Sequence, residues 1–563
     1  MISEILSTNP KALEMLKSLS VINTKVETNI DKIAVEKSYE TQNFNNDFKI
    51  LLETGLIKEK EGKVGIYEFA FPYLQEMLET QTDKKSHEYA LQYYEEKMKK
   101  LKIDILDDIE ILFHKVKVNP TEILINEFLS IANGINQFDQ RHNRLIDIGI
   151  ELLIFEDKYK APILFVLGNI LSIIGNPEDA EKIYLNAIKI FKKLAKKYYR
   201  IYLPYIAAIQ KNLGTLYTDL KRFEDAEKIY SNALNSYREI EKNYYNVYTP
   251  DFDSKEYSKT DESYVDDLKK YTKLLEKNYD IYLPEEPSPT SDLGNVCIDL
   301  DLLEDLQDGS IDSFDNYKKL AHMCYHMYLI DIAKTQSNLG LIYTNLRRYE
   351  EAEKMHLEAL KIKRKVAESY PDQVLPELAF TFLDLGDLYA SLNRFEEAEP
   401  MFKDALKTSK ELVKDNPEVY MYNTALIQNS LGIIYTRLKN YDLAEQMYLD
   451  ALKTFKIYAK ENPEPYIYNV ADVQNNLGNL SLILKNLERA QYYLSKAIKK
   501  DPNNTIIIYN IACLEALNNN PTKALELLSK LIEIDNSFIE RAKSDQNFNN
   551  IRDLKEFKEL IGN

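Results

Sequence analysis

Residues 212–234, NLGTLYTDLKRFEDAEKIYSNAL, contain the pattern that decides the fold. A Leu-Gly pair lies near the start, Tyr217 follows three residues after the glycine, and small residues follow at Ala226 and Ala233. Small residues at fixed spacing on two successive helices let the backbones approach closely, while larger side chains fill the remaining interface. The stretch therefore predicts two antiparallel helices, joined by a short turn that begins at Leu220.

The same pattern recurs along the chain as an internal repeat. Most consecutive Leu-Gly pairs lie 46 residues apart, but the last step, from Gly478 to Ala512, is 34 residues. The glycines of these pairs are Gly168, Gly214, Gly294, Gly340, Gly386, Gly432 and Gly478. A helix pair cannot bury its apolar face alone, so we expect a stack of pairs with a long concave surface lined by the first helices.

These motifs resemble the tetratricopeptide repeat, and the unit with RYEEAEKMHLEAL at residues 348–360 is similar to the lengthened repeats of kinesin light chains. The resemblance implies an all-α fold, a right-handed superhelix (α-solenoid), over about two-thirds of the chain. Compared with the usual unit of about 34 residues, the longer unit would extend each helix by about 9 Å. We expect repeats at 161–248 and 317–536, degenerate helical repeats at 83–160, and a capping helix at 537–563.

Residues 1–82 have a different pattern. Helical periodicity at Lys11–Leu19 and Phe48–Thr54 precedes a glycine-bounded segment, Gly55–Gly62, and the alternating Tyr67, Phe69 and Phe71. Helices followed by a two-stranded hairpin resemble a winged-helix domain, and FAFPYLQEMLE at 69–79 makes the region similar to that of STAND-type signalling ATPases. No GxxxxGK phosphate-binding motif occurs in the sequence, so nucleotide hydrolysis is not expected. Nine Lys and Arg against thirteen Asp and Glu in this segment disfavour DNA binding.

The composition disfavours several classes of protein. The 563 residues include 72 Lys and Arg against 90 Asp and Glu, and the net charge of −18 disfavours general nucleic-acid and anionic-membrane binding. Three widely spaced cysteines indicate neither a disulfide framework nor a zinc ribbon. Because no segment has the pattern of a signal peptide or a membrane span, we expect a soluble cytoplasmic protein.

Segment 249–316 is expected to be an acidic insertion with a degenerate repeat. Turn and coil formers, such as PEEPSPTSD, replace the helical pattern there. Between Asn278 and Tyr317 there are 11 acidic residues and no Lys or Arg. Two interpretations are open: a solvated insertion, which we favour, or an acidic arm that recruits or competes for a basic partner.

A metal site is a weaker hypothesis. His322 and His326 lie four residues apart with Cys324 between them, so both imidazoles would share one face of a helix. A third and a fourth ligand are not evident, and the alternative is an aromatic-rich helix that uses these side chains in its packing. The sequence also lacks the motifs of common nucleophilic, zinc-dependent and dinucleotide-dependent enzymes. We therefore expect no metal, no cofactor and no catalysis.

A row of polar residues on the first helices is the candidate binding site. In the resembling family, the position before Leu-Gly faces the concave groove, where an Asn amide can pair with a peptide backbone as donor and acceptor. The alternative is that these residues solvate their helix or bond a neighbouring repeat. The candidates are Asn212, Asn338, Asp384, Asn429, Asn475, Asn476 and Arg437, with Lys211, Asp292 and Lys334 as neighbours or equivalents.

The expected function is that of a non-enzymatic scaffold, which binds a peptide or helix of a partner protein in the concave groove. The polar row lacks the dense Lys and Arg of a carboxylate clamp, so partner segments that carry basic residues are expected. An alternative is the sensor or regulatory half of a STAND-like switch, or a transcription regulator, with the winged helix as its output. The third hypothesis is a metalloenzyme at His322 and His326.

Overall fold

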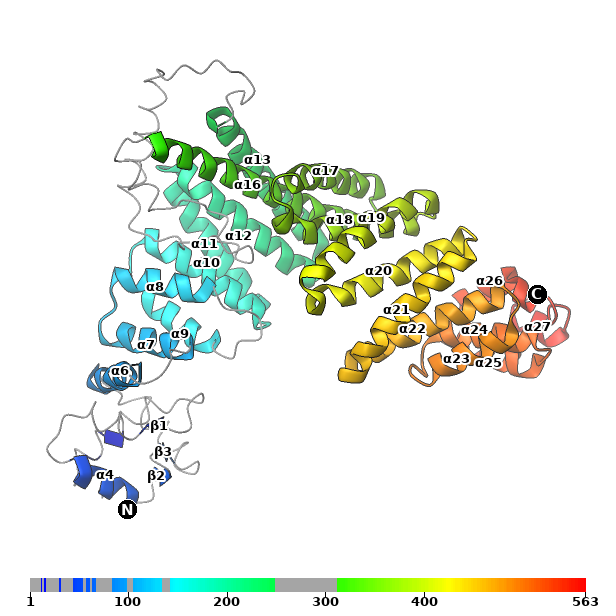
Figure 1. Cartoon of the computed structure of the whole chain (residues 1–563), viewed down its shortest axis with the longest axis horizontal. Helices are drawn as coiled ribbons and strands as arrows, with labels where there is room; N and C mark the ends of the chain where they lie inside the picture. The colour runs from blue at the N-terminus through cyan, green and yellow to red at the C-terminus, as the bar shows by residue number, and fades with distance from the viewer. Residues whose placement is uncertain are drawn as a thin grey trace. The chain divides into compact units, whose positions relative to one another are not determined.

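A computed structural model describes residues 12, 15–16, 30–31, 44–53, 57–60, 63–66, 84–98, 105–133, 142–248 and 311–562. The chain divides into two compact units, Met1–Tyr328 (unit 1) and Leu329–Asn563 (unit 2). Figure 1 shows that paired helices make up most of the described chain. The acidic insertion expected at 249–316 lies outside the described residues up to position 310.

The N-terminal part of unit 1 contains a helix and a small antiparallel sheet with strand order β1-β3-β2. Its elements are β1 (Ile30–Asp31), α4 (Phe44–Glu53), β2 (Ile57–Lys60) and β3 (Lys63–Ile66). Strands β2 and β3 form a hairpin that pairs Ile57 with Ile66. The second strand therefore precedes the aromatic residues that were expected to carry it, and Tyr67, Phe69 and Phe71 lie outside the described residues. The winged-helix assignment stays a prediction.

Unit 1 continues as helices that pack on their neighbours in chain order. Within its described part, the region expected to hold degenerate repeats contains α6–α9 and the start of α10. The pairs α10–α11 and α12–α13 follow. The bounds are α6 (Lys84–Met98), α7 (Ile105–Val118), α8 (Glu122–Asn133), α9 (His142–Leu152), α10 (Asp157–Ile173), α11 (Pro177–Ala195), α12 (Tyr199–Asp219) and α13 (Phe223–Tyr248).

Unit 2 is a stack of helix pairs that begins with the C-terminal part of α16. The bounds are α16 (Ile311–Asn345), α17 (Tyr349–Ala367), α18 (Pro371–Ser391), α19 (Phe395–Asp415), α20 (Pro417–Arg437), α21 (Tyr441–Glu461), α22 (Pro463–Ile483), α23 (Leu487–Ile498), α24 (Thr505–Leu517) and α25 (Pro521–Ile534). Each of α18–α22 has 21 residues, whereas α24 has 13 and α25 has 14. The longer repeat therefore lengthens both of its helices, as the spacing predicts.

The end of unit 2 differs from the single capping helix expected at 537–563. It contains two short helices, α26 (Ser537–Ser544) and α27 (Lys555–Leu560), with a 3-10 turn at Gln546–Phe548 between them. Phe538, Phe548 and Phe557 pack with residues of α24 and α25 in one buried cluster. Three separate apolar anchors thus cover the last repeat, where a single amphipathic helix was expected.

The repeat glycines lie within helices because a side chain would collide with the second helix of the same pair. A Cβ at Gly432 would lie 2.6 Å from the ring of Tyr448, and one at Gly214 would lie 2.6 Å from the ring of Tyr230. In each described copy, the facing side chain comes sixteen residues after the glycine. The Leu-Gly pair is therefore a packing requirement, which confirms the prediction of closely approaching helix pairs.

Each short turn between paired helices contains one residue with a left-handed backbone conformation, which allows the chain to reverse. Lys439 has a φ of 62°, and the N–H of Asn440 then donates to the carbonyl oxygen of Tyr435 at 2.8 Å. Lys221, Arg347, Asn393 and Lys485 have the same backbone conformation in the other repeats. This conformation closes the first helix and reverses the chain, so the two helices pack side by side.

An arginine, a tyrosine and a glutamate join successive repeats through contacts that the spacing did not predict. The guanidinium of Arg394 lies 4.5 Å from the ring centroid of Tyr389, and it donates to Glu353 of the preceding repeat at 2.7 Å. The hydroxyl of Tyr389 donates to the same carboxylate at 3.0 Å. Arg222, Tyr217 and Glu181 make the equivalent contacts in unit 1. The sequence signal is an arginine five residues after the repeat tyrosine.

Candidate functional site

The candidate polar residues lie on the first helices of the repeats, as the pattern predicts. Asn212 lies on α12 in unit 1, and Asn338, Asp384, Asn429, Asn475 and Asn476 lie on α16, α18, α20 and α22 in unit 2. We call the five residues of unit 2 the first-helix row. All are partly exposed except Asn475, which is buried. Arg437 is the last residue of α20 and is exposed.

Amides of this row bond asparagines of the neighbouring repeats. Asn476 donates through Nδ2 to Oδ1 of Asn429 at 3.0 Å, and Asn510 donates to Oδ1 of Asn475 at 2.8 Å. In unit 1, Asn212 donates in the same way to Asn169 at 2.9 Å. These bonds give the asparagines the structural role that the sequence left open as an alternative. A peptide contact by the same amides stays a prediction.

The two flanking lysines are already engaged. Lys211 is buried on α12. Lys334 forms an ion pair of 3.5 Å with Glu377 of α18. Asp292, the remaining equivalent, lies outside the described residues.

A buried lysine lies beside the first-helix row, and sequence reasoning missed it. Nζ of Lys363, on α17, donates to Oγ1 of Thr381 at 2.7 Å, to Oγ of Ser337 at 3.1 Å and to the carbonyl oxygen of Glu377 at 3.2 Å. The carboxylate of Glu377 lies 3.6 Å away. We call Lys363 and these partners the Lys363 cluster. The sequence contained a signal for this buried lysine, because the equivalent position in other repeats holds the aromatic residues Phe191, Tyr237 and Phe455.

Burial changes the titration of the groups around Lys363. It lowers the pKa of Lys363 to about 8, although Glu377 and Asp384 partly oppose the change. Burial, assisted by the charge of Lys363, lowers the pKa of His356 to about 4. Nδ1 of His356 has no hydrogen-bond partner and lies 4.0 Å from the carboxylate of Asp384. His356 is therefore neutral at pH 7.

Two carboxylates on α18 are accessible to solvent and yet crowded by protein. The side chain of Asp384 is 37% exposed, but desolvation by the surrounding protein raises its pKa to about 7, and Lys363 opposes the rise. Desolvation also raises the pKa of the exposed Asp387 to about 6 and raises the pKa of Asp472 on α22. A carboxylate that is both accessible and desolvated gains from a cation that replaces the missing water.

The metal hypothesis gains no support in the described part of the chain. His322 and His326 both lie on α16, as the spacing predicts, but no group of three metal-ligating side chains occurs among the described residues.

The structure instead brings together two histidines that are distant in sequence. Nδ1 of His87 lies 2.9 Å from Nδ1 of His114, and Glu110 and Arg144 lie beside them. Burial lowers the pKa of His114 well below its usual value, and the charges of His87 and Arg144 lower it further.

No described helix combines the length and apolar character needed to cross a lipid bilayer.

Comparisons with known proteins agree with the repeat pattern. Models of the tetratricopeptide repeat match residues 161–194, 206–241, 331–411, 383–460 and 471–504. No curated protein matches the chain significantly. Repeats of this kind generally form non-enzymatic scaffolds for protein interaction.

Several solved structures are similar to the chain. One is a signal-transduction ATPase of the STAND class with a tetratricopeptide-repeat sensor from Pyrococcus horikoshii, with 16% identity and a TM-score of 0.43 over 95% of this chain. The chain spans only 65% of that protein's length. The apo form of RapI has 14% identity and a TM-score of 0.42, over 81% of this chain and 95% of its own.

A further similar structure is YrrB, described as a tetratricopeptide-repeat protein with an unusual peptide-binding site. Its identity is 21% and its TM-score 0.25, over 38% of this chain and 92% of its own. The family models and the stacked helix pairs, with their glycine-to-ring contacts, together show that the chain contains tetratricopeptide repeats.

Proposed function

We propose that this protein-interaction scaffold binds a basic peptide or helix of a partner protein at the first-helix row of unit 2 and the adjoining Asp387 of α18, without catalysing a reaction. One observation carries the proposal: Asp384 and Asp387 are accessible carboxylates whose pKa values are raised by desolvation to about 7 and about 6. A protonated or poorly solvated carboxylate is a costly feature on a surface unless a partner uses it. A Lys or Arg side chain of the partner would supply the missing charge compensation.

The direct test is fluorescence anisotropy with three labelled peptides, in which alanine alternates with arginine, glutamate or glutamine. We expect the arginine peptide to bind best. The double variant Asp384→Asn and Asp387→Asn should weaken it about tenfold, because two charge-assisted contacts are lost. Asp442→Asn is the matched control, since Asp442 is an exposed aspartate on the second helix α21. Equal binding of all three peptides, or no effect of the double variant, would contradict the proposal.

The pH dependence of binding tests the same contact with a defined sign. A bound cation favours the ionised carboxylate, so binding releases the proton that Asp384 still carries below its pKa of about 7. We therefore expect the affinity for the arginine peptide to rise between pH 6 and pH 8. The double variant should show a flat profile over this range. A falling affinity in the native chain would oppose the proposed role of Asp384.

The asparagines make a second, separable contribution. Asn476→Ala removes the donor to Asn429, so it should cost about 1 kcal/mol of unfolding free energy as well as weaken peptide binding. Asn338→Ala, on another first helix, provides the comparison. A paired measurement of peptide affinity and urea unfolding separates the two effects. Loss of stability without loss of affinity would assign Asn476 to repeat packing alone.

The helix α4 and the three-stranded sheet favour a second candidate, a regulator whose N-terminal module is the output. The order of helix and hairpin is that expected of a winged helix, although acidic residues outnumber basic ones in segment 1–82. A gel-shift experiment with random duplex DNA at low salt tests this candidate. Absence of retardation would dismiss a DNA-binding output.

A further inference from the structure

Unit 1 contains a basic surface that contrasts with the acidic chain. From Lys182 to Thr218 the sequence has eight Lys and Arg and no Asp or Glu, although the whole chain has a net charge of −18. Much of this charge lies on the second helix α11. The exposed Lys189 and Lys192 of α11, and Lys196 directly after it, have no ion-pair partner in the described part of the chain. Lys193 is engaged by Asp157 at 2.6 Å.

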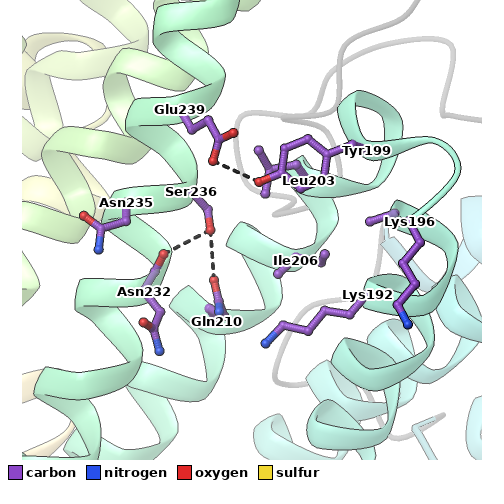
Figure 2. A pocket seen from close by; sticks show the side chains of 11 residues that line it. Lys192, Lys196, Tyr199, Leu203, Ile206, Gln210, Asn232, Asn235, Ser236 and Glu239 are labelled. Atoms are coloured by element: carbon purple, nitrogen blue, oxygen red, sulfur yellow. Dashed lines mark hydrogen bonds between the residues drawn. The ribbon is translucent and has the colours of Figure 1, made fainter.

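A groove runs beside these lysines. Figure 2 shows Lys192 and Lys196 on one wall, from α11 and its C-terminal end, and Asn232, Asn235, Ser236 and Glu239 on the opposite wall, from α13. Helix α12 lies between the walls and contributes Leu203, Ile206 and Gln210. The cavity volume is about 430 Å³, and the same two lysines also border a second cavity of about 660 Å³ on the α10 side of α11. We call the first cavity the lysine groove.

The lining of the lysine groove has three distinct chemical parts. Lys192 and Lys196 provide free positive charge on one edge. The exposed amides of Asn232 and Asn235 provide donors and acceptors on the other edge. The apolar side chains between them form a floor. The one carboxylate in the lining, Glu239, accepts a hydrogen bond of 2.9 Å from the hydroxyl of Tyr199.

We propose that the lysine groove docks an acidic segment of a partner protein. Glutamate or aspartate side chains of the segment pair with Lys192 and Lys196, its backbone bonds Asn232, and an apolar side chain rests on Ile206. This surface lies between the second helices α11 and α13, and it is distinct in place and in charge from the first-helix row of unit 2. The chain would therefore bind two partner segments of opposite charge.

The same positions in unit 2 show why the groove is specific to unit 1. Lys456 and Lys460 on α21 are the repeat equivalents of Lys192 and Lys196. Acidic neighbours, Glu461 and Glu464, follow them directly, whereas no acidic residue follows Lys196 until after Thr218. A peptide is favoured over a nucleic acid because the net charge of the chain repels a long polyanion, while a short segment meets only the local lysines.

The test uses the full chain and a fluorescein-labelled peptide of alternating glutamate and leucine, measured by anisotropy. We expect the double variant Lys192→Glu and Lys196→Glu to weaken binding at least about tenfold. The position-matched control, Lys456→Glu with Lys460→Glu, should leave it within about twofold. Asn232→Ala should cost about threefold. Thermal unfolding of each variant establishes that the fold is kept.

Three results would overturn the proposal. The first is equal binding of a peptide in which glutamine replaces glutamate. The second is tighter binding of duplex DNA than of the acidic peptide at the same salt concentration, since this would assign the lysines to nucleic acid. The third is a gain in peptide affinity when the acidic residues between Asp280 and Asp315 are changed to Asn and Gln. That gain would mean that the chain's own acidic segment occupies the groove.

Discussion

Two repeat interfaces within unit 2 have the same backbone plan but opposite chemistry. Between α20, α21 and α22, Phe455 is buried against Val473 in a continuous apolar core. Between α16, α17 and α18, the equivalent position holds Lys363, and Thr381 replaces the valine. His356 likewise replaces Tyr448 against the repeat glycine. The comparison shows that the repeat fixes helix geometry through glycine and small residues, while the interface chemistry can vary.

The largest expected effect comes from placing a lysine in the apolar interface. Phe455→Lys should reduce the free energy of unfolding by about 3–5 kcal/mol, because Val473 stands where Thr381 bonds Lys363 and Asn469 stands where Glu377 supplies a carboxylate. Urea unfolding followed by circular dichroism measures the change. Ile457→Lys is the control, since Ile457 is exposed on the same helix. Adding Val473→Thr should recover about 1 kcal/mol, and an unchanged double variant would refute the equivalence of the two interfaces.

A side chain at the repeat glycine should have the next largest effect. Gly432→Ala places a methyl group 2.6 Å from the buried ring of Tyr448, and overpacking of this kind costs about 1–3 kcal/mol. The better helix propensity of alanine returns up to about 1 kcal/mol. We expect net destabilisation in urea unfolding, larger than for Ile433→Ala at the neighbouring exposed position. A stabilised variant would show that the ring can move.

Removing the buried charge should have a smaller effect of opposite sign. Lys363→Met keeps the length of the side chain and should stabilise unit 2 by about 1–2 kcal/mol, because the desolvation cost of the amine disappears. The hydroxyl of Thr381 keeps its hydrogen bond to the carbonyl oxygen of Glu377 at 2.9 Å, so few buried polar groups lose all their hydrogen-bond partners. The exposed Lys361→Met is the matched control. Strong destabilisation would mean that the ion pair with Glu377 outweighs burial.

The pH dependence of stability provides the finest comparison. The pKa of Lys363 is about 8 in the folded chain and near 10.5 when unfolded, so between these values the unfolded chain binds more protons. Stability from this group therefore rises with pH across the window, by at most about 1.4 kcal/mol per pH unit. We expect the stability of the native chain to rise with pH more steeply than that of Lys363→Met, as measured by the midpoints of urea unfolding. If stability depends on pH in the same way in both chains, the pKa of Lys363 is not lowered, and its amine must be in contact with water.

Much of the repeat architecture could be predicted from particular residues. The spacing of Leu-Gly and alanine identified the helix pairs, and the short loops identified antiparallel neighbours. A two-stranded hairpin was predicted, but its second strand was expected at the alternating aromatic residues 67–71. The strand lies at Lys63–Ile66 instead, because the aromatic alternation was a stronger signal than the short IKEK and KVGI segments. The C-terminal cap was predicted as one helix, because the spacing of Phe538, Phe548 and Phe557 does not reveal the turns between them.

The sequence alone determined the helix pairs, the polar row and the overall charge, because these follow from periodicity and composition. Only the tertiary structure decided which polar groups meet. Asn476 bonds Asn429, His87 meets His114, and Lys363 enters a core position, although each pair or set is far apart in the chain. Desolvation depends on all surrounding atoms, so the raised pKa of Asp384 could not be read from its neighbours in sequence. The lysine groove likewise exists only where three helices come together.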